Sequence, residues 1–179
     1  MTNKWNTSLI GALMVCLCVI SLPACALTEQ DADPQAQAQK RLTGTWALVE
    51  APEIRADGSR ADTFGANPKG LLVIDDAGRY SLQIYKSNRS KYSSGDVKKA
   101  TEDELRAAAL SHSTHFGRCF IDVEKNVLVF RIEQAANVNW NGTEQSRQFE
   151  LKGDMLSYRV PATANSSGTT TISVWKKIH

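Results

Sequence analysis

The chain has 179 residues and a formal net charge of +2, from 21 basic and 19 acidic side chains, and 42% of its residues are hydrophobic. This length suffices for one domain with a sizeable core. The near balance of charge, without a basic stripe, argues against a nucleic-acid-binding protein, so we expect no nucleic-acid partner.

The first 26 residues have the layout of a secretory signal. A polar start that contains Lys4 precedes an apolar run over residues 9–20, and small residues surround Cys25. The run is shorter than the about 20 apolar residues that a membrane-spanning helix needs. Two processing routes stay open: a signal over residues 1–26, or a lipoprotein signal over residues 1–24, which would lipidate Cys25. We therefore expect an exported protein, either periplasmic or tethered to a membrane through the lipidated Cys25.

A stretch of low hydrophobicity follows the signal. Residues 27–40 are rich in Gln, Ala and Asp and have no apolar periodicity. This composition predicts a flexible linker, so we expect the folded domain to occupy residues 41–179. Within that range Cys119 is the only cysteine in the sequence, which excludes an internal disulfide.

The first half of the domain predicts three strands, over residues 42–50, 69–75 and 79–86. A turn at residues 76–78 joins the last two as a hairpin. Side chains alternate between the two faces of a strand. In the third strand one face carries Tyr80, Leu82 and Ile84, and the other carries Ser81, Gln83 and Tyr85.

A short helix is predicted after a polar loop. Thr101 is suited to the N-cap position, and Glu104 stands three residues later, as a capping box requires. A small apolar stripe follows, made of Leu105, Ala108, Ala109 and Leu110.

Five further strands complete the domain. They are predicted over residues 113–123, 127–134, 143–151, 155–160 and 169–178. Eight short strands, mostly joined as hairpins, predict an all-β fold, either a closed antiparallel barrel or a sandwich, with one short inserted helix. A barrel of eight strands encloses a core or one small ligand. Because the first and last strands of a barrel meet, we expect Trp46 and Trp175 to lie together at its base.

Arg147 is the most informative side chain in the predicted strands. By alternation it shares a face with Gln145, Phe149 and Leu151. A buried arginine needs a partner, because an unpaired buried charge is very costly. Two interpretations follow. Arg147 pairs with an internal carboxylate or caps a loop, or it lines a cavity and holds an acidic or carbonyl group of a small ligand.

Two other side chains are candidates for the same cavity. His115 shares a face with Ile121 and is either a hydrogen-bonded core residue or a polar cavity contact. Tyr85 faces either the cavity or the exterior, since alternation alone does not identify the inner face. His112 and His115 are three residues apart, but they straddle a helix end and a strand with no nearby Cys or carboxylate pattern. We therefore predict no metal site.

Several segments together resemble the bacterial lipocalin-like domain family. Gly44-Thr45-Trp46 matches the G-x-W signature of lipocalins. Three more segments agree in order and spacing: residues 64–70 before the hairpin, Phe116-Gly117, and residues 139–149. The resemblance extends from about Leu42 to Lys176. It implies a calycin-type, eight-stranded antiparallel barrel with an internal cavity, and it supplies a fold more than a function.

Two functional hypotheses follow. The first is an exported, non-catalytic binder of a small hydrophobic or amphipathic ligand, which Arg147, Gln145, Tyr85 and His115 would contact. The second is a barrel-cavity enzyme of the isomerase or cyclase type, in which His115 or Tyr85 moves a proton and Arg147 stabilises negative charge. The chain contains no G-x-S-x-G, P-loop, dinucleotide fingerprint or paired-carboxylate site. We therefore favour the binder, with no catalytic residue and no cofactor. The enzyme needs His115 or Tyr85 to converge on Arg147 inside one cavity.

Overall fold

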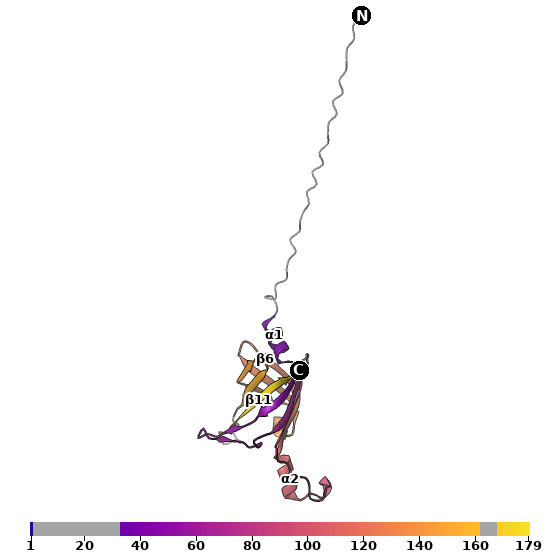
Figure 1. Cartoon of the computed structure of the whole chain (residues 1–179), viewed down its shortest axis with the longest axis vertical. Helices are drawn as coiled ribbons and strands as arrows, with labels where there is room; N and C mark the ends of the chain where they lie inside the picture. Colours follow the sequence, from indigo (N-terminus) through magenta and orange to yellow (C-terminus); the bar gives the residue numbers. More distant parts are fainter. Residues whose placement is uncertain (2–32, 162–167) are drawn as a thin grey trace. The chain divides into compact units, whose positions relative to one another are not determined.

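The computed structural model describes Met1, residues 33–161 and residues 168–179. The predicted signal, the first part of the predicted linker and Cys25 lie outside these residues. Residues from Ala32 to His179 form one compact unit. In this unit a curled sheet carries helix α1 near one end and helix α2 near the other (Figure 1).

The described residues contain eleven strands, and every pairing between them is antiparallel. Two of them, β2 (Glu53–Ile54) and β3 (Arg60–Ala61), have only two residues each. The longer ones are β1 (Gly44–Glu50), β4 (Lys69–Ile74), β5 (Arg79–Tyr85), β6 (His112–Asp122), β7 (Val127–Ala135), β8 (Glu144–Arg147), β9 (Phe149–Lys152), β10 (Met155–Val160) and β11 (Thr170–Ile178).

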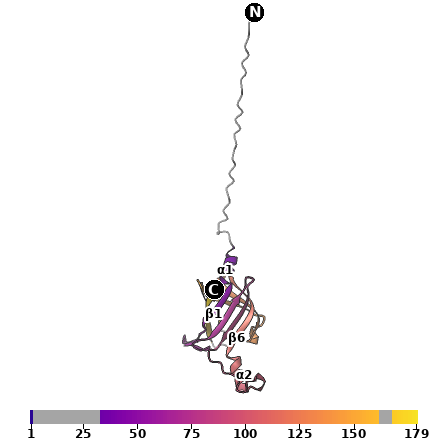
Figure 2. The same ribbon diagram turned by 45° about the vertical axis from the view of Figure 1, so that its right-hand side comes forward.

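The sheet closes because one strand changes neighbours part-way along its length. The strand predicted over residues 143–151 is interrupted at Gln148, where β8 ends and β9 begins. β8 pairs with β7, and β9 pairs with β10, which leads through β11 back to β1. At the interruption, the Arg159 N–H donates to the Gln148 carbonyl at 3.0 Å. When β8 and β9 are counted as one interrupted strand, eight long strands form a lipocalin-like barrel, which confirms the predicted fold class. Figure 2 shows the curl of the sheet around β1 and β6.

The core follows the alternation that the sequence predicts. Along β5 the side chains of Tyr80, Leu82 and Ile84 are buried and those between them are exposed. Trp46 and Trp175 are fully buried on adjoining strands, and the Trp46 Nε1 donates to the Leu42 carbonyl at 3.0 Å. Burying a tryptophan of about 150–250 Å² contributes on the order of 4–6 kcal/mol of apolar transfer free energy. These two rings anchor the closing pair of strands.

Helix α1 (Pro34–Leu42) corrects the prediction of a flexible linker. The side chain of Asp33 caps it by accepting from the Gln35 N–H at 3.0 Å, and Pro34 occupies the first turn, where its missing N–H costs nothing. The Gln35 amide reaches the Ile121 carbonyl, and Leu42 is fully buried in the core. The linker prediction is wrong for residues 34–40, and the folded unit starts ahead of residue 41.

Helix α2 (Glu102–Ala109) begins with the predicted capping box. The Glu104 N–H donates to Thr101 Oγ1 at 3.3 Å, and the Thr101 N–H donates to Glu104 Oε2 at 2.9 Å. The predicted apolar stripe is exposed instead of buried, since α2 has no buried residue. In the part of the chain that the structure describes, neither helix has the length and apolar character to cross a bilayer.

Candidate functional site

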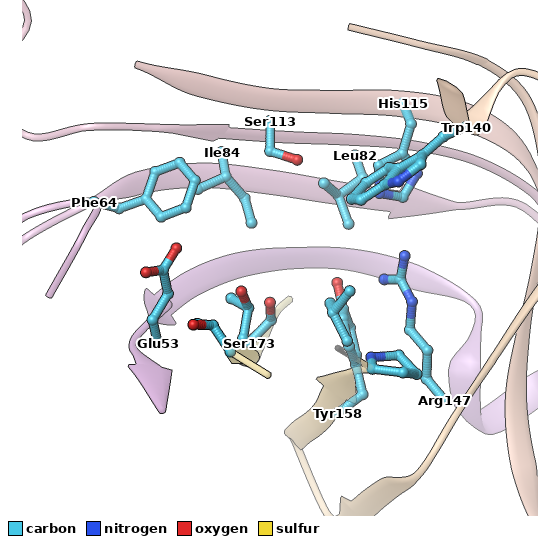
Figure 3. Close-up of a pocket in the computed structure, with 14 residues that line it drawn as sticks. Glu53, Phe64, Leu82, Ile84, Ser113, His115, Trp140, Arg147, Tyr158 and Ser173 are labelled. Atoms are coloured by element: carbon cyan, nitrogen blue, oxygen red, sulfur yellow. The ribbon is translucent and has the colours of Figure 1, made fainter. Parts of the chain in front are cut away.

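A cavity of about 210 Å³ lies inside the barrel. Its deep part is formed by Arg147, Tyr158 and His115, which are 1%, 2% and 4% exposed. Glu53 and Phe64 lie at the other end, where the lining side chains are partly exposed (Figure 3). The remaining lining residues are Leu82, Ile84, Ser113, Trp140, Val160, Pro161, Thr169, Thr171 and Ser173. The cavity therefore has a buried polar end and a mouth.

Two aromatic rings flank the guanidinium of Arg147. Its central carbon lies 4.2 Å from the ring centre of Phe130 and 5.1 Å from that of Tyr158. The strand register explains this position, because Phe130 of β7 pairs with Gln145, two residues before Arg147, and Tyr158 of β10 pairs with Phe149, two residues after it. Cations are attracted to aromatic faces, and more strongly when water is excluded.

Arg147 has few hydrogen-bond partners for a buried cation. One terminal nitrogen donates to Gln145 Oε1 at 2.8 Å, and Nε has no partner. None of the ion pairs among the described residues, counted to 4.0 Å, includes Arg147. Burial lowers the pKa of Arg147, but a guanidinium stays protonated in proteins. The described residues therefore contradict the interpretation in which Arg147 pairs with an internal carboxylate.

His115 lies beside Arg147 in the buried end of the cavity. Its Nδ1 is 2.7 Å from the Tyr80 hydroxyl, and its ring packs edge-on against Phe130 and Trp140 at 5.7 and 5.8 Å between centres. Burial and then the charge of Arg147 lower the pKa of His115 to about 3, so the ring is neutral near pH 7. Donation from the Tyr80 hydroxyl to Nδ1 satisfies both groups and leaves Nε2–H as a donor.

Two more buried polar atoms near Arg147 lack partners. The Tyr158 hydroxyl and the Trp175 Nε1 have no well-aligned hydrogen bond in the described part of the chain, although Tyr158 interacts weakly with Trp175, Ser173 and Arg147. Burial raises the pKa of Tyr158, and the positive charge of Arg147 opposes that rise. Most buried polar groups in folded proteins are hydrogen-bonded, so each exception calls for an explanation. A polar group of a ligand would provide the missing partners.

A family model described as a lipocalin-like domain matches residues 43–178. The chain belongs to the lipocalin-like domain family. No curated protein matches the chain. The family match starts inside the described unit, so the lipocalin-like domain contains the whole barrel and every cavity-lining residue, whereas α1 precedes it.

The lipocalin-like barrel places the other predicted site residues in different positions. Gln145 holds the Arg147 guanidinium and does not line the cavity. Tyr85 lies outside the cavity, on the face of β5 that carries Ser81 and Gln83, and the Arg89 guanidinium stacks on its ring at 4.9 Å. A ligand contact by Tyr85 inside the cavity is therefore wrong.

His112 and His115 do not come together as metal ligands would. Both lie on β6, where a separation of three residues puts side chains on opposite faces. His112 Nδ1 is 3.0 Å from the Ala108 carbonyl, and its ring lies near Tyr85. Among the residues described, no group of three or more His, Cys, Asp or Glu side chains could hold a metal ion.

Sequence reasoning missed four residues that shape the cavity. Phe130 and Tyr158 flank Arg147, Trp140 covers His115, and Glu53 lies at the mouth. Alternation along β7 and β10 groups Phe130 with Ile132 and Tyr158 with Leu156 on apolar faces, so it offered a signal for burial. It offered none for contact with Arg147, which depends on the register between strands.

Proposed function

We propose that this lipocalin-like protein binds a small amphipathic molecule and holds its acidic or carbonyl group on Arg147. The observation that carries the proposal is a guanidinium that is 1% exposed, borders a cavity and has no carboxylate partner among the described residues. An anionic group would receive charge-assisted hydrogen bonds from Arg147, and only the anion would lose water on binding, because the cation is already buried. Neutral His115 and the Tyr158 hydroxyl supply further donors.

Apolar walls support the same proposal. Leu82 and Ile84 line the passage from the buried end toward Phe64 at the mouth, and Val160 lines the mouth at the level of Glu53. Sites for drug-sized ligands measure about 300–1,000 Å³, so a cavity of about 210 Å³ suits a smaller molecule. The ligand we propose has a short apolar body and one polar end.

The alternative, an isomerase or cyclase, is less well supported. His115 does converge on Arg147 in one cavity, as this alternative requires, while Tyr85 lies elsewhere. A general base works best with a pKa near the working pH. The pKa of His115, about 3, makes it a poor proton acceptor at neutral pH. The same neutral ring is well suited to donate a fixed hydrogen bond.

Export is part of the proposal. The signal layout of residues 1–26 would place the barrel outside the cytoplasm, and lipidation of Cys25 would tether it to a membrane. Mass spectrometry of the protein from its own host tests this directly. A mature chain that begins with an acylated Cys25 supports the tether, a start after Ala26 supports free export, and an intact signal contradicts both.

Native mass spectrometry of the same protein tests the binding proposal. We expect a small acidic or carbonyl compound to accompany the wild-type protein and to be absent from a folded Arg147→Leu variant. Arg131→Leu is the matched control, since Arg131 is exposed and pairs with Glu144 on the outside of the barrel. A compound retained by Arg147→Leu, or a wild-type protein that binds no acidic compound, would contradict the proposal.

A further inference from the structure

The cavity carries two charged side chains of opposite sign, one near each end. Among its lining residues, Arg147 and Glu53 are the only charged ones, with His115 neutral. The carboxylate of Glu53 makes no hydrogen bond or ion pair with the described residues, and Figure 3 shows it on the Phe64 side of the cavity, across from the guanidinium. Neither charge therefore has an ion-pair partner among the described residues.

Strand pairing places Glu53 and Tyr158 at different backbone levels along β11. Glu53 of β2 is opposite Thr171 of β11, and Tyr158, which flanks Arg147, is opposite Ser173. Thr171 and Ser173 are two residues apart on one strand, so the two levels differ by about 6–7 Å. An extended chain advances about 3.3–3.6 Å for every three backbone bonds, so roughly six bonds span this distance.

We propose that the ligand is a zwitterion of the ω-amino carboxylate type, with its carboxylate on Arg147, its ammonium group at Glu53 and a short methylene chain between them. This inference rests on the proposed function and names the class of ligand for that site. The apolar side chains of Leu82 and Ile84 lie between the two charged ends and suit the methylene chain. Val160 also lines the cavity, at the level of Glu53, since both residues are opposite Thr171.

The mouth disfavours a ligand that ends in a plain hydrocarbon tail. Such a tail would displace water from the Glu53 carboxylate and leave it without a partner, which is costly. An ammonium group in the same place replaces the lost water by a charge-assisted hydrogen bond. Because Glu53 is only partly buried, we expect a modest gain of about two- to fivefold in affinity, as for exposed ion pairs.

Calorimetric titration of the purified full-length protein with matched probes tests this inference. Hexanoate carries the carboxylate alone, and 6-aminohexanoate adds the ammonium group at the far end. We expect the wild-type protein to bind 6-aminohexanoate more tightly than hexanoate, and Glu53→Gln to remove the difference. Glu53→Lys should instead favour the dicarboxylate hexanedioate. Glu124→Gln is the control, since Glu124 is exposed in the turn between β6 and β7, away from the cavity.

The outcomes separate the two proposals. Hexanoate binding that needs Arg147 but gains nothing from the amine overturns the zwitterion and leaves the Arg147 anchor standing. A preference for 6-aminohexanoate that survives in folded Glu53→Gln also overturns it. If neither acid binds to the wild-type protein, the Arg147 anchor and the zwitterion proposal both fail. They also both fail if Arg147→Leu binds the two acids as tightly as the wild-type protein does. Thermal unfolding of each variant confirms that it is folded.

Discussion

The guanidinium carbon of Arg147 lies 4.2 Å from the ring centre of Phe130, and both side chains are inaccessible to solvent. The aromatic face stabilises the cation but supplies no hydrogen-bond acceptor, and Gln145 supplies only one. The barrel therefore holds a positive charge whose solvation is incomplete. This condition underlies the first prediction.

Replacing Arg147 with Leu should abolish the binding of hexanoate while the barrel stays folded. We expect the free energy of unfolding to stay equal or to rise by up to about 1–4 kcal/mol, because apolar groups often replace buried ions without loss. Denaturant unfolding and calorimetric titration measure the two effects. A large loss of stability would instead show that Arg147 holds the fold together.

Replacing Tyr80 with Phe should destabilise the protein by about 1–3 kcal/mol. The change removes the hydroxyl 2.7 Å from His115 Nδ1 and leaves a buried ring nitrogen without a partner. Tyr85→Phe is the control, because Tyr85 lies outside the cavity, and its effect should stay within about 0.5 kcal/mol. Equal effects of the two substitutions in urea unfolding would contradict a structural role for the Tyr80–His115 contact.

Stability should fall with pH in the acid range because of His115. Its pKa is lowered from 6.5 to about 3 in the folded protein, so between these values the unfolded chain binds more protons than the folded one. Stability is then fully retained above pH 6.5 and decreases by up to about 1.4 kcal/mol per pH unit as pH falls toward 3. Urea unfolding at several pH values should show that the free energy of unfolding depends less steeply on pH in His115→Gln than in the wild-type protein. The same dependence on pH in both proteins would contradict the low pKa of His115.

Helix α1 should contribute to the stability of the barrel. Leu42 is fully buried, so Leu42→Ala should cost about 2–5 kcal/mol. A chain that begins at Thr43 should be less stable than one that begins at Ala32, as thermal unfolding would show. Leu110→Ala, at a side chain that is 67% exposed, serves as the control. Equal thermal stability of the two chains would mean that α1 does not stabilise the barrel.

The strands were predictable because each long segment is half buried, so its side chains alternate as the sheet requires. The capping box of α2 was equally local. Helix α1 was missed because Ala38 and Leu42 are its only hydrophobic residues that pack against the core, which leaves no apolar period to detect. The pair Asp33-Pro34 was a valid signal for the start of a helix, but the polar composition of residues 27–40 favoured a linker instead.

The candidate site was predictable only in part. Alternation placed Arg147 on the same side as Phe149 and Leu151, which pack against the core. It did not identify which face of β5 is internal, so Tyr85 was included in error. The contacts of Arg147 with Phe130 and Tyr158 join different strands, and no pattern within one strand records the register between them.

The interruption at Gln148 gives the barrel a seam, and Arg147 is the last residue before it. Strand ends with few ladder hydrogen bonds open more readily than strand centres, so amide hydrogen exchange should be fastest where β8 gives way to β9. A ligand that contacts both Arg147 and Tyr158 would stabilise the sheet at this seam. Amide hydrogen exchange at the seam should then become slower as the ligand occupies more of the cavities.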